Sequence, residues 1–473
     1  MDRVPLTAGD IADATGGRLV RGHAGEAIEG ISIDSRTAGA GDFFVAIRGE
    51  RFDGHRFVAD ALARGVRGAM VETAAAEAAA AGVAAGDGDT VIIAVGDTTR
   101  GLQDMARTVR QRSGTKVVAI TGSAGKTTTK EVAAEFLSAR YRVFRNKGNF
   151  NNHIGLPLSL LELRSRPEVA VVELGMNHPG EIRTLVGMAQ PEVRVWTNVG
   201  DAHLGFFASA DAIADAKGEI LDQAQAEDVL VANADDHRIL ARAGAFAGRI
   251  VTFGIDHPAD VRAVAVEERG LDGTAAHIHT PVGDIALQTS LLGLGNLSNV
   301  LAAIAVALQF DVPLDDVAAR AAALRPARRR GELLRLPGGL TLIDDSYNSS
   351  PAALKRALLT VNAATGSARK IAVLGEMLEL GIHAIRLHEE CGAAAAAAGL
   401  DLLIAVGGPP ARVLADAAVR SGMAPARVAC VGTSAEAADL AAERTRAGDL
   451  VLVKGSRGIG TDAVVERLKA EFA

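Results

Sequence analysis

The stretch AITGSAGKTTTKE, residues 119–131, decides the fold of the central part of this chain. The apolar run KVVAIT precedes the glycines and the helical pattern KTTTKEVAAEFLSAR follows them, so the loop joins a predicted strand to a predicted helix. Free N–H groups and the positive end of the helix dipole favour phosphate at such a position. Lys126 is then placed to reach the outer phosphates of a nucleotide, and the hydroxyl of Thr127 to bind Mg²⁺.

The loop departs from the common phosphate-binding pattern in one respect. Ile120 stands five positions before Gly125, where that pattern has a glycine. Gly122 and Gly125 still permit a close approach of the backbone to a ligand. A glycine-rich turn without a ligand is the alternative interpretation.

The segments around the loop predict an α/β protein of three domains, which agrees with the length of 473 residues. From about Thr115, short apolar runs alternate with helical patterns, as in a parallel sheet wrapped by helices. We place a central P-loop ATPase domain at 113–327, in which residues 261–290 have the character of antiparallel hairpins. A second alternation predicts a Rossmann-like α/β domain at 328–473. Residues 1–112 form the N-terminal domain.

Composition excludes several classes of protein. The chain has 50 Lys and Arg against 57 Asp and Glu, so it lacks the basic excess of a general nucleic-acid binder. Its two cysteines form no CxxC pair, which fits a reducing cytoplasm. The N-terminus has no signal-peptide pattern, and no apolar run reaches the roughly 18 residues of a membrane helix. We expect a cytoplasmic protein that does not insert into membranes.

Two candidate cation ligands follow predicted strands. Glu173 ends the strand in VVELG, and His203 in DAHLG follows the end of another. Ligands of parallel sheets lie at the carboxyl ends of strands, so this pair could hold a cation beside the phosphates. A salt bridge is the alternative for Glu173 and a capping or packing role for His203, because Mg²⁺ prefers oxygen ligands. Lys217 lies on a predicted helix, where a lysine is ordinarily exposed to solvent.

The segment NKGNFNNHIGLP, residues 146–157, is dense in Asn and Gly. Such runs usually form turns, since Asn tolerates unusual backbone angles. The amides of Asn149, Asn151 and Asn152 also offer uncharged polar groups to a substrate, and both interpretations stay open.

Taken together, these motifs resemble the Mur ligase family, ATP-dependent enzymes that add amino acids to the peptidoglycan precursor. TGSAGKTT fits that family's own loop, TGxxGKT[ST], in which the first glycine is absent. NFNNHIGLP, ELGMNHPGEI, TNVGDAHLGFF and AKGEI follow in the family order, and the resemblance covers nearly the whole chain.

The C-terminal segments IDDSYNSSP, LGEMLELG and LVKGSRGIGTD resemble the members that join D-alanyl-D-alanine to UDP-N-acetylmuramoyl-tripeptide through an acyl phosphate. The DNPR-type segment of the members that add the third residue is absent. The nearest rival is nonetheless a ligase adding that diamino acid, or a glutamate to a folate. Rivals of other classes are a P-loop small-molecule kinase, an NTPase switch and an inactive binding module.

The resemblance implies roles for individual residues. The expected cofactors are ATP and two Mg²⁺ ions. The implied ligands of the ions are Thr127, Glu173, His203 and a carbamylated Lys217. The implied catalytic residues are Lys126, Glu173, His203 and Lys217. The implied ATP-binding residues are Gly122, Ser123, Ala124, Gly125, Lys126, Thr127, Thr128, Asn296, Asn299, Arg330 and Asp345. The implied substrate-binding residues are Ser35, Arg36, Asp53, Gly54 and His55 for the UDP end, Asn149, Asn151 and Asn152, and Tyr347 and Asn348 for the dipeptide.

The register of the hinge arginine stays open among Arg328, Arg329 and Arg330, and Gly295 stands where the family has a histidine. We expect a monomer whose domains close around the substrates.

Overall fold

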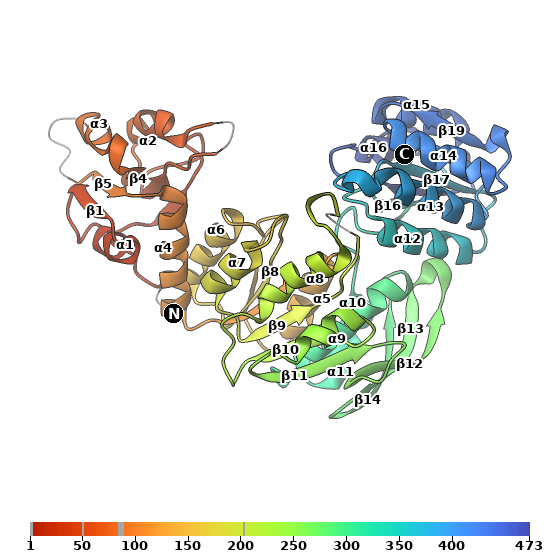
Figure 1. The fold of residues 1–473 in the computed structure, drawn as a ribbon, viewed down its shortest axis with the longest axis horizontal. Helices are drawn as coiled ribbons and strands as arrows, with labels where there is room; N and C mark the ends of the chain where they lie inside the picture. Colours follow the sequence, from red (N-terminus) through yellow and green to blue (C-terminus); the bar gives the residue numbers. More distant parts are fainter. Residues whose placement is uncertain (1–2, 50–51, 84–88, 202–203) are drawn as a thin grey trace. The chain divides into compact units, whose positions relative to one another are not determined.

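The computed structural model describes residues 3–49, 52–83, 89–201 and 204–473. It confirms an α/β protein with three sheets in which parallel pairing predominates (Figure 1). The chain forms two compact units, one of residues 1–119, 141–176 and 180–192, and one of residues 120–140, 177–179 and 193–473. This division differs from the boundaries 1–112, 113–327 and 328–473, which stay predictions. No helix among the described residues is long and apolar enough to cross a bilayer.

The first sheet has the strand order β1-β5-β4-β3-β2. Among its described strands, β1 pairs with β5 antiparallel and the other pairs are parallel. All five residues of β5 are buried, as expected for a central strand covered on both faces. The strands are β1 (Arg18–Arg21), β2 (Gly30–Ser32), β3 (Asp42–Val45), β4 (Gly68–Glu72) and β5 (Val91–Val95). The helices are α1 (Ala8–Thr15), η1 (Gly54–Phe57), α2 (Val58–Ala63), η2 (Thr73–Ala75), α3 (Ala76–Ala81) and α4 (Thr98–Ser113).

The second sheet has nine strands in the order β14-β13-β12-β11-β10-β9-β6-β8-β7. The strands β9, β10, β11 and β12 pair in parallel, whereas β12, β13 and β14 form antiparallel hairpins. The predicted change from a parallel sheet to hairpins is therefore confirmed. The strands are β6 (Lys116–Thr121), β7 (Val143–Arg145), β8 (Val169–Glu173), β9 (Val193–Trp196), β10 (Val229–Asn233), β11 (Arg249–Gly254), β12 (Val261–Glu268), β13 (Thr274–Thr280) and β14 (Gly283–Thr289).

Helices connect these strands. They are α5 (Lys126–Leu137), α6 (Gly155–Leu161), η3 (Glu162–Ser165), α7 (Glu181–Ala189), η4 (Leu204–Phe206), α8 (Ala210–Gly218), η5 (Glu219–Leu221), α9 (His237–Ala243), η6 (Gly270–Asp272), α10 (Gly293–Leu308) and α11 (Leu314–Ala323). Almost every side chain in the middle of α10 is buried, because its sequence is apolar around the whole helix.

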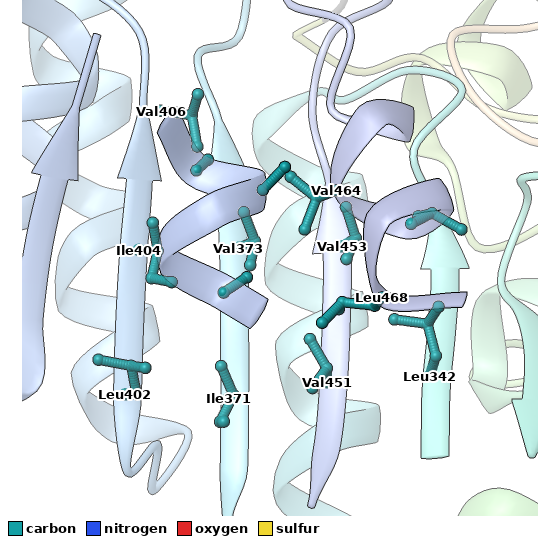
Figure 2. Close-up of a cluster of buried hydrophobic side chains, with 14 of the residues drawn as sticks. Leu342, Ile371, Val373, Leu402, Ile404, Val406, Val451, Val453, Val464 and Leu468 are labelled. Carbon is teal, nitrogen blue, oxygen red and sulfur yellow. The ribbon is translucent and has the colours of Figure 1, made fainter. Parts of the chain in front are cut away.

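The third sheet has the order β15-β16-β20-β17-β18-β19 and is parallel apart from the pair β15–β16. Figure 2 shows its core, where Val464 and Leu468 of α16 lie over the valines of β20. The strands are β15 (Glu332–Arg335), β16 (Thr341–Asp345), β17 (Lys370–Gly375), β18 (Leu402–Val406), β19 (Val428–Val431) and β20 (Leu450–Lys454). The helices are α12 (Pro351–Ala363), η7 (Gly381–His383), α13 (Ala384–Ala397), α14 (Pro409–Arg420), η8 (Pro425–Arg427), α15 (Ser434–Arg444) and α16 (Asp462–Glu471).

Candidate active site

The glycine-rich loop lies between the end of β6 at Thr121 and the start of α5 at Lys126, as the sequence predicts. Lys126 is the first residue of the helix, and its Nζ donates a hydrogen bond to the carbonyl of Gly122 at 2.8 Å. Gly122 has a φ of 150°, and a β-carbon there would lie 1.9 Å from Oγ1 of Thr197. The loop therefore keeps its shape only with glycine at this position.

The segment after β9 braces the loop from within the same unit. The amide of Asn198 accepts from the N–H of Ala124 at 2.8 Å and donates to its carbonyl at 3.0 Å. The hydroxyl of Thr197 donates to the same carbonyl at 2.8 Å. Ser123 Oγ accepts from the N–H of Gly200 at 2.8 Å. The sequence reasoning missed these two bracing residues, Thr197 and Asn198, although the polar pair directly after an apolar strand was the available signal.

The first turns of α10 contact the other side of the loop. Gly125 has a φ of 81°, and a β-carbon there would lie 2.1 Å from Oδ1 of Asn299. That oxygen accepts from Thr129 Oγ1 at 3.2 Å, and the amide of Asn299 donates to Asn296 at 3.3 Å. Asn296 and Asn299, predicted to bind ATP, thus lie beside the loop in the free protein.

In the other unit, Glu173 ends β8 and is buried. Its carboxylate accepts a hydrogen bond from the Asn151 amide at 2.8 Å, and its N–H donates to Asn146 at 3.1 Å. These bonds attach the Asn-rich segment to the end of the strand. Asn152 accepts from the N–H of Gly155, the first residue of α6, at 2.8 Å, while Asn149 is exposed. Both interpretations of the Asn-rich segment, turn and binding surface, remain compatible with this geometry.

Lys217 is not the solvent-exposed lysine that is ordinary on a helix, which was the alternative to the metal-supporting role that the resemblance implies. It lies in the last turn of α8 with a relative exposure of 1%. Burying a charged lysine is unfavourable unless its amine gains partners or loses its charge. The burial of Lys217 therefore requires a specific environment. The predicted ligand His203 lies outside the described residues. Among the residues that the structure describes, no three His, Cys, Asp or Glu side chains are grouped so that they could hold a metal ion.

At the carboxyl ends of the third sheet, Asp345 of β16 lies opposite Lys454 of the parallel strand β20. Nζ of Lys454 lies 2.6 Å from Oδ2 of Asp345, and it also donates to the carbonyl of Asn348 at 2.9 Å. Lys454 is almost fully buried, so this pair organises the loop that carries the predicted substrate residues Tyr347 and Asn348. In the free protein, Asp345, which was predicted to contact ATP, is therefore paired with Lys454.

The three arginines of the predicted hinge differ in their surroundings. Arg329 forms an ion pair with Asp462 at 2.9 Å. The guanidinium of Arg330 lies 4.1 Å from the centre of the Tyr347 ring, and that of Arg457 lies 5.8 Å from it. Arg330 is therefore held by a cation–π contact, which an incoming ligand can replace without breaking an ion pair.

In the first unit, the predicted UDP residues form a compact local structure. Asp53 begins η1 by accepting from the N–H of His55, and Nδ1 of His55 lies 2.6 Å from the same carboxylate, which lowers the pKa of Asp53. Nε2 of His55 accepts from the N–H of Glu72 at 2.9 Å. A β-carbon at Gly54 would lie 2.7 Å from the carbonyl of Ile47. These bonds give the segment a packing role in the free protein.

The remaining two predicted residues of this group lie near the surface. Arg36 is exposed and donates to Asp34, which lowers the pKa of that carboxyl to about 2. Ser35 is half-buried.

Comparison with known proteins places these features in one family. Family models described as "Mur ligase family, catalytic domain", "Mur ligase middle domain" and "Mur ligase, glutamate ligase domain" match residues 27–110, 120–307 and 329–457. The UDP-N-acetylmuramoyl-tripeptide–D-alanyl-D-alanine ligase of Bacillus subtilis is 33% identical over 93% of this chain and 93% of its own length.

Solved structures give the same result. The structure of MurF from Acinetobacter baumannii has 31% identity and a TM-score of 0.87, covering 99% of this chain and 100% of that one. The MurF ligase of Thermotoga maritima, solved in complex with ADP, has 28% identity and a TM-score of 0.81, covering 94% and 98%. With relatives that match along nearly its full length and a loop of the form TGxxGKT[ST], this chain belongs to the Mur ligase family.

Proposed function

We propose that this protein is an ATP-dependent ligase that joins D-alanyl-D-alanine to UDP-N-acetylmuramoyl-tripeptide in peptidoglycan precursor synthesis. The observation that carries the proposal is the B. subtilis ligase of that name, which is related over 93% of both chains. The glycine loop supports it, because a phosphate cradle at the start of α5 is what ATP use requires.

The proposed reaction has two steps. The terminal carboxylate of the tripeptide attacks the γ-phosphorus of ATP, the bond to the β-phosphate oxygen breaks, and ADP leaves. The amino group of the dipeptide then attacks the acyl phosphate, loses a proton, and expels inorganic phosphate as the peptide bond forms. A carboxylate is a poor electrophile until it is phosphorylated. The protein's task is therefore to position the reactants and to stabilise negative charge.

Lys126 and the loop from Gly122 to Thr128 are proposed to hold the phosphates. Lys126 already lies at the loop, where its Nζ donates a hydrogen bond to the Gly122 carbonyl. Asn296, Asn299, Arg330 and Asp345 are proposed to complete the ATP site.

Thr127, Glu173, His203 and Lys217 are proposed to hold two Mg²⁺ ions, which would neutralise phosphate charge when bound. The hydroxyl of Thr127 and the carboxylate of Glu173 are the hard oxygen ligands that Mg²⁺ prefers. Lys217 fits if its amine is carbamylated by CO₂, because that exchange replaces a buried cation with an oxygen anion. Its burial supports this assignment.

The substrate residues remain proposals of the same kind. Ser35, Arg36, Asp53, Gly54 and His55 are proposed to hold the UDP end, with Asn149, Asn151 and Asn152 further along the substrate. Tyr347 and Asn348 are proposed to face the dipeptide. We further propose that the protein acts as a monomer in the cytoplasm. Two cysteines without a disulfide, Cys391 and Cys430, fit that compartment.

One assay tests the function. Purified protein is supplied with ATP, Mg²⁺, UDP-N-acetylmuramoyl-tripeptide and D-alanyl-D-alanine, and both the pentapeptide product and phosphate are measured. We expect phosphate release only when both substrates are present. Parallel reactions offer the UDP-dipeptide with diaminopimelate or lysine. Product in those reactions alone would replace the proposal with the ligase that adds the third residue. Phosphate release that does not depend on any of these substrates would refute both functions.

A further inference from the structure

Two glycines meet where the segment after β9 crosses the segment after β17. Gly205, in η4, donates a backbone hydrogen bond to the carbonyl of Glu379 at 2.8 Å. A β-carbon at Gly205 would lie 2.8 Å from that carbonyl oxygen and 2.9 Å from the backbone nitrogen of Gly381. A β-carbon at Gly381 would lie 2.7 Å from Cα of Gly205. The two backbones therefore leave no room for a side chain at either position.

The segment that carries Gly205 begins with the residues that brace the glycine-rich loop. The N–H of Ser123 donates to the carbonyl of Asn198 at 3.0 Å, and the N–H of Gly200 donates to Oγ of Ser123 at 2.8 Å. Gly205 follows only five positions after Gly200 in the chain. One side of the crossing thus belongs to the segment that holds the loop between β6 and α5.

The other side of the crossing is fixed on the third sheet. The N–H of Leu378 donates to Oγ of Ser456 at 2.9 Å, and the carbonyl of Glu376 accepts from the N–H of Ser456 at 3.3 Å. The N–H of Met377 donates to Nε2 of the buried His388 at 2.9 Å. Residues 376–378 are therefore held by the loop after β20 and by α13, so the chain enters the crossing from a fixed direction.

The backbone at the crossing is also strained. Glu379 has a φ of 64°, which side chains other than glycine rarely adopt. Such strain persists only where the surrounding contacts fix the backbone, and it is most common at functional sites. In this conformation the carbonyl of Glu379 accepts the hydrogen bond from Gly205.

We propose that the crossing of Gly205 and Gly381 sets the spacing between the glycine-rich loop and the carboxyl ends of the third sheet. Lys454 ends β20 there, and the proposed dipeptide residue Tyr347 follows β16. Two backbones in direct contact have no rotamers that could absorb a change, so they fix a distance more tightly than flexible side chains do. Gly205 is then a positioning residue, which touches no reactant itself.

The inference rests on the proposed function and concerns its second step. The acyl phosphate would form at the glycine-rich loop, and the dipeptide would approach from the third sheet. A misplacement of about 1 Å can cost roughly 100-fold in rate. If the amine arrives late, water attacks the acyl phosphate instead, which restores the carboxylate and releases phosphate. Each such event consumes one ATP without forming a peptide bond.

Gly205→Ala tests the crossing, because it adds a methyl group at a position without a positive φ. Gly244→Ala is the matched control, since Gly244 also lacks a positive φ and nothing lies within 4 Å of its β-carbon position. Phosphate and pentapeptide are measured in the same reaction, and calorimetry gives the Kd of a non-hydrolysable ATP analogue with Mg²⁺. We expect Gly205→Ala to form pentapeptide at least about tenfold more slowly and to release more phosphate than pentapeptide. The Kd of the analogue should stay unchanged.

Ser456→Ala is the second variant, and it decides the matter if Gly205→Ala does not fold. It removes the bond to Leu378 without adding bulk, so the same excess of phosphate is expected, to a smaller extent. One phosphate per pentapeptide in the folded variants, at any rate of turnover, would overturn the inference alone. Weaker binding of the analogue with that same ratio would make the crossing a support of the loop and would also overturn it. A wild type that forms no pentapeptide would refute the proposed function together with the inference.

Discussion

The side chain of Asn299 fills the place that a β-carbon at Gly125 would take, with Oδ1 2.1 Å from that position. Gly125 is the residue before helix α5, and its φ of 81° lies in the left-handed region. The loop thus depends on glycine for two independent reasons, backbone conformation and space.

Gly125→Ala is expected to raise the KM for ATP by at least about tenfold, which corresponds to about 1.4 kcal/mol. The new methyl group must displace Asn299 and with it the hydrogen bond to Thr129. Gly114→Ala is the control, because Gly114 also has a positive φ, of 70°, but nothing lies within 4 Å of its β-carbon position. Both variants share the backbone strain, and only Gly125→Ala has the clash. Equal KM values for the two variants would contradict this prediction, because they would show that the Asn299 side chain can move away without cost.

Lys217→Ala is expected to lower turnover by about 100-fold, the upper range for residues that support a metal site. The reason is its burial in α8, where a neutral methyl group can neither be carbamylated nor hold charge. Steady-state turnover is measured with and without acetate or formate, which should restore part of the activity of the alanine variant. Lys469→Ala removes a surface lysine bonded to Glu466 and should leave turnover unchanged. Wild-type turnover in Lys217→Ala would refute the role.

Because of His388, we expect the region around the third sheet to lose stability at acid pH. The residue is fully buried, its Nε2 accepts from the N–H of Met377 at 2.9 Å, and Nδ1 lies 2.7 Å from the carbonyl of Ala384. Desolvation lowers the pKa of His388 below its usual 6.5. The unfolded chain therefore binds the proton more readily, and stability falls as the pH drops below about 6.5 toward the folded-state pKa.

The measurement compares thermal unfolding at about pH 7.5 and about pH 5.5 for the wild type and His388→Gln. We expect the variant to be less stable at the higher pH, because its bonds are poorer, and to lose less stability on acidification. His23→Gln, at an exposed histidine, should keep the wild-type dependence. An unchanged dependence in His388→Gln would contradict the assignment.

Breaking the pair between Asp345 and Lys454 is expected to destabilise the protein. Lys454→Met leaves the carboxylate without its partner and should cost about 3 kcal/mol, the lower end for buried pairs because Asp345 is partly exposed. The double variant Asp345→Asn, Lys454→Met removes both charges and should recover part of that loss. Equilibrium denaturation measures both. A double variant less stable than Lys454→Met would show that the pair contributes more than compensation of charge.

Much of the fold followed from local patterns. The strand, loop and helix at residues 116–137 and the hairpins from β12 to β14 were predicted correctly, because apolar periodicity and glycine turns act between residues that are close in the chain. The glycine-rich loop was also placed correctly between a strand and a helix, since the two glycines that shape it, Gly122 and Gly125, are only three positions apart in the sequence. The structure gives the positions of the described site residues, whereas their roles in binding and catalysis stay predictions.

By itself, then, the sequence determined the α/β class of the protein and the position of the glycine-rich loop between β6 and α5. Only the tertiary structure decided that Lys217 is buried, that Asn198 braces the loop, and that Gly205 lies against Gly381. Thr129 and Asn299 meet across 170 positions of chain, a separation at which no helical or strand period relates two residues. Such contacts depend on the order of strands in a sheet and on which helix face turns inward, and both are set by the packing of the whole unit.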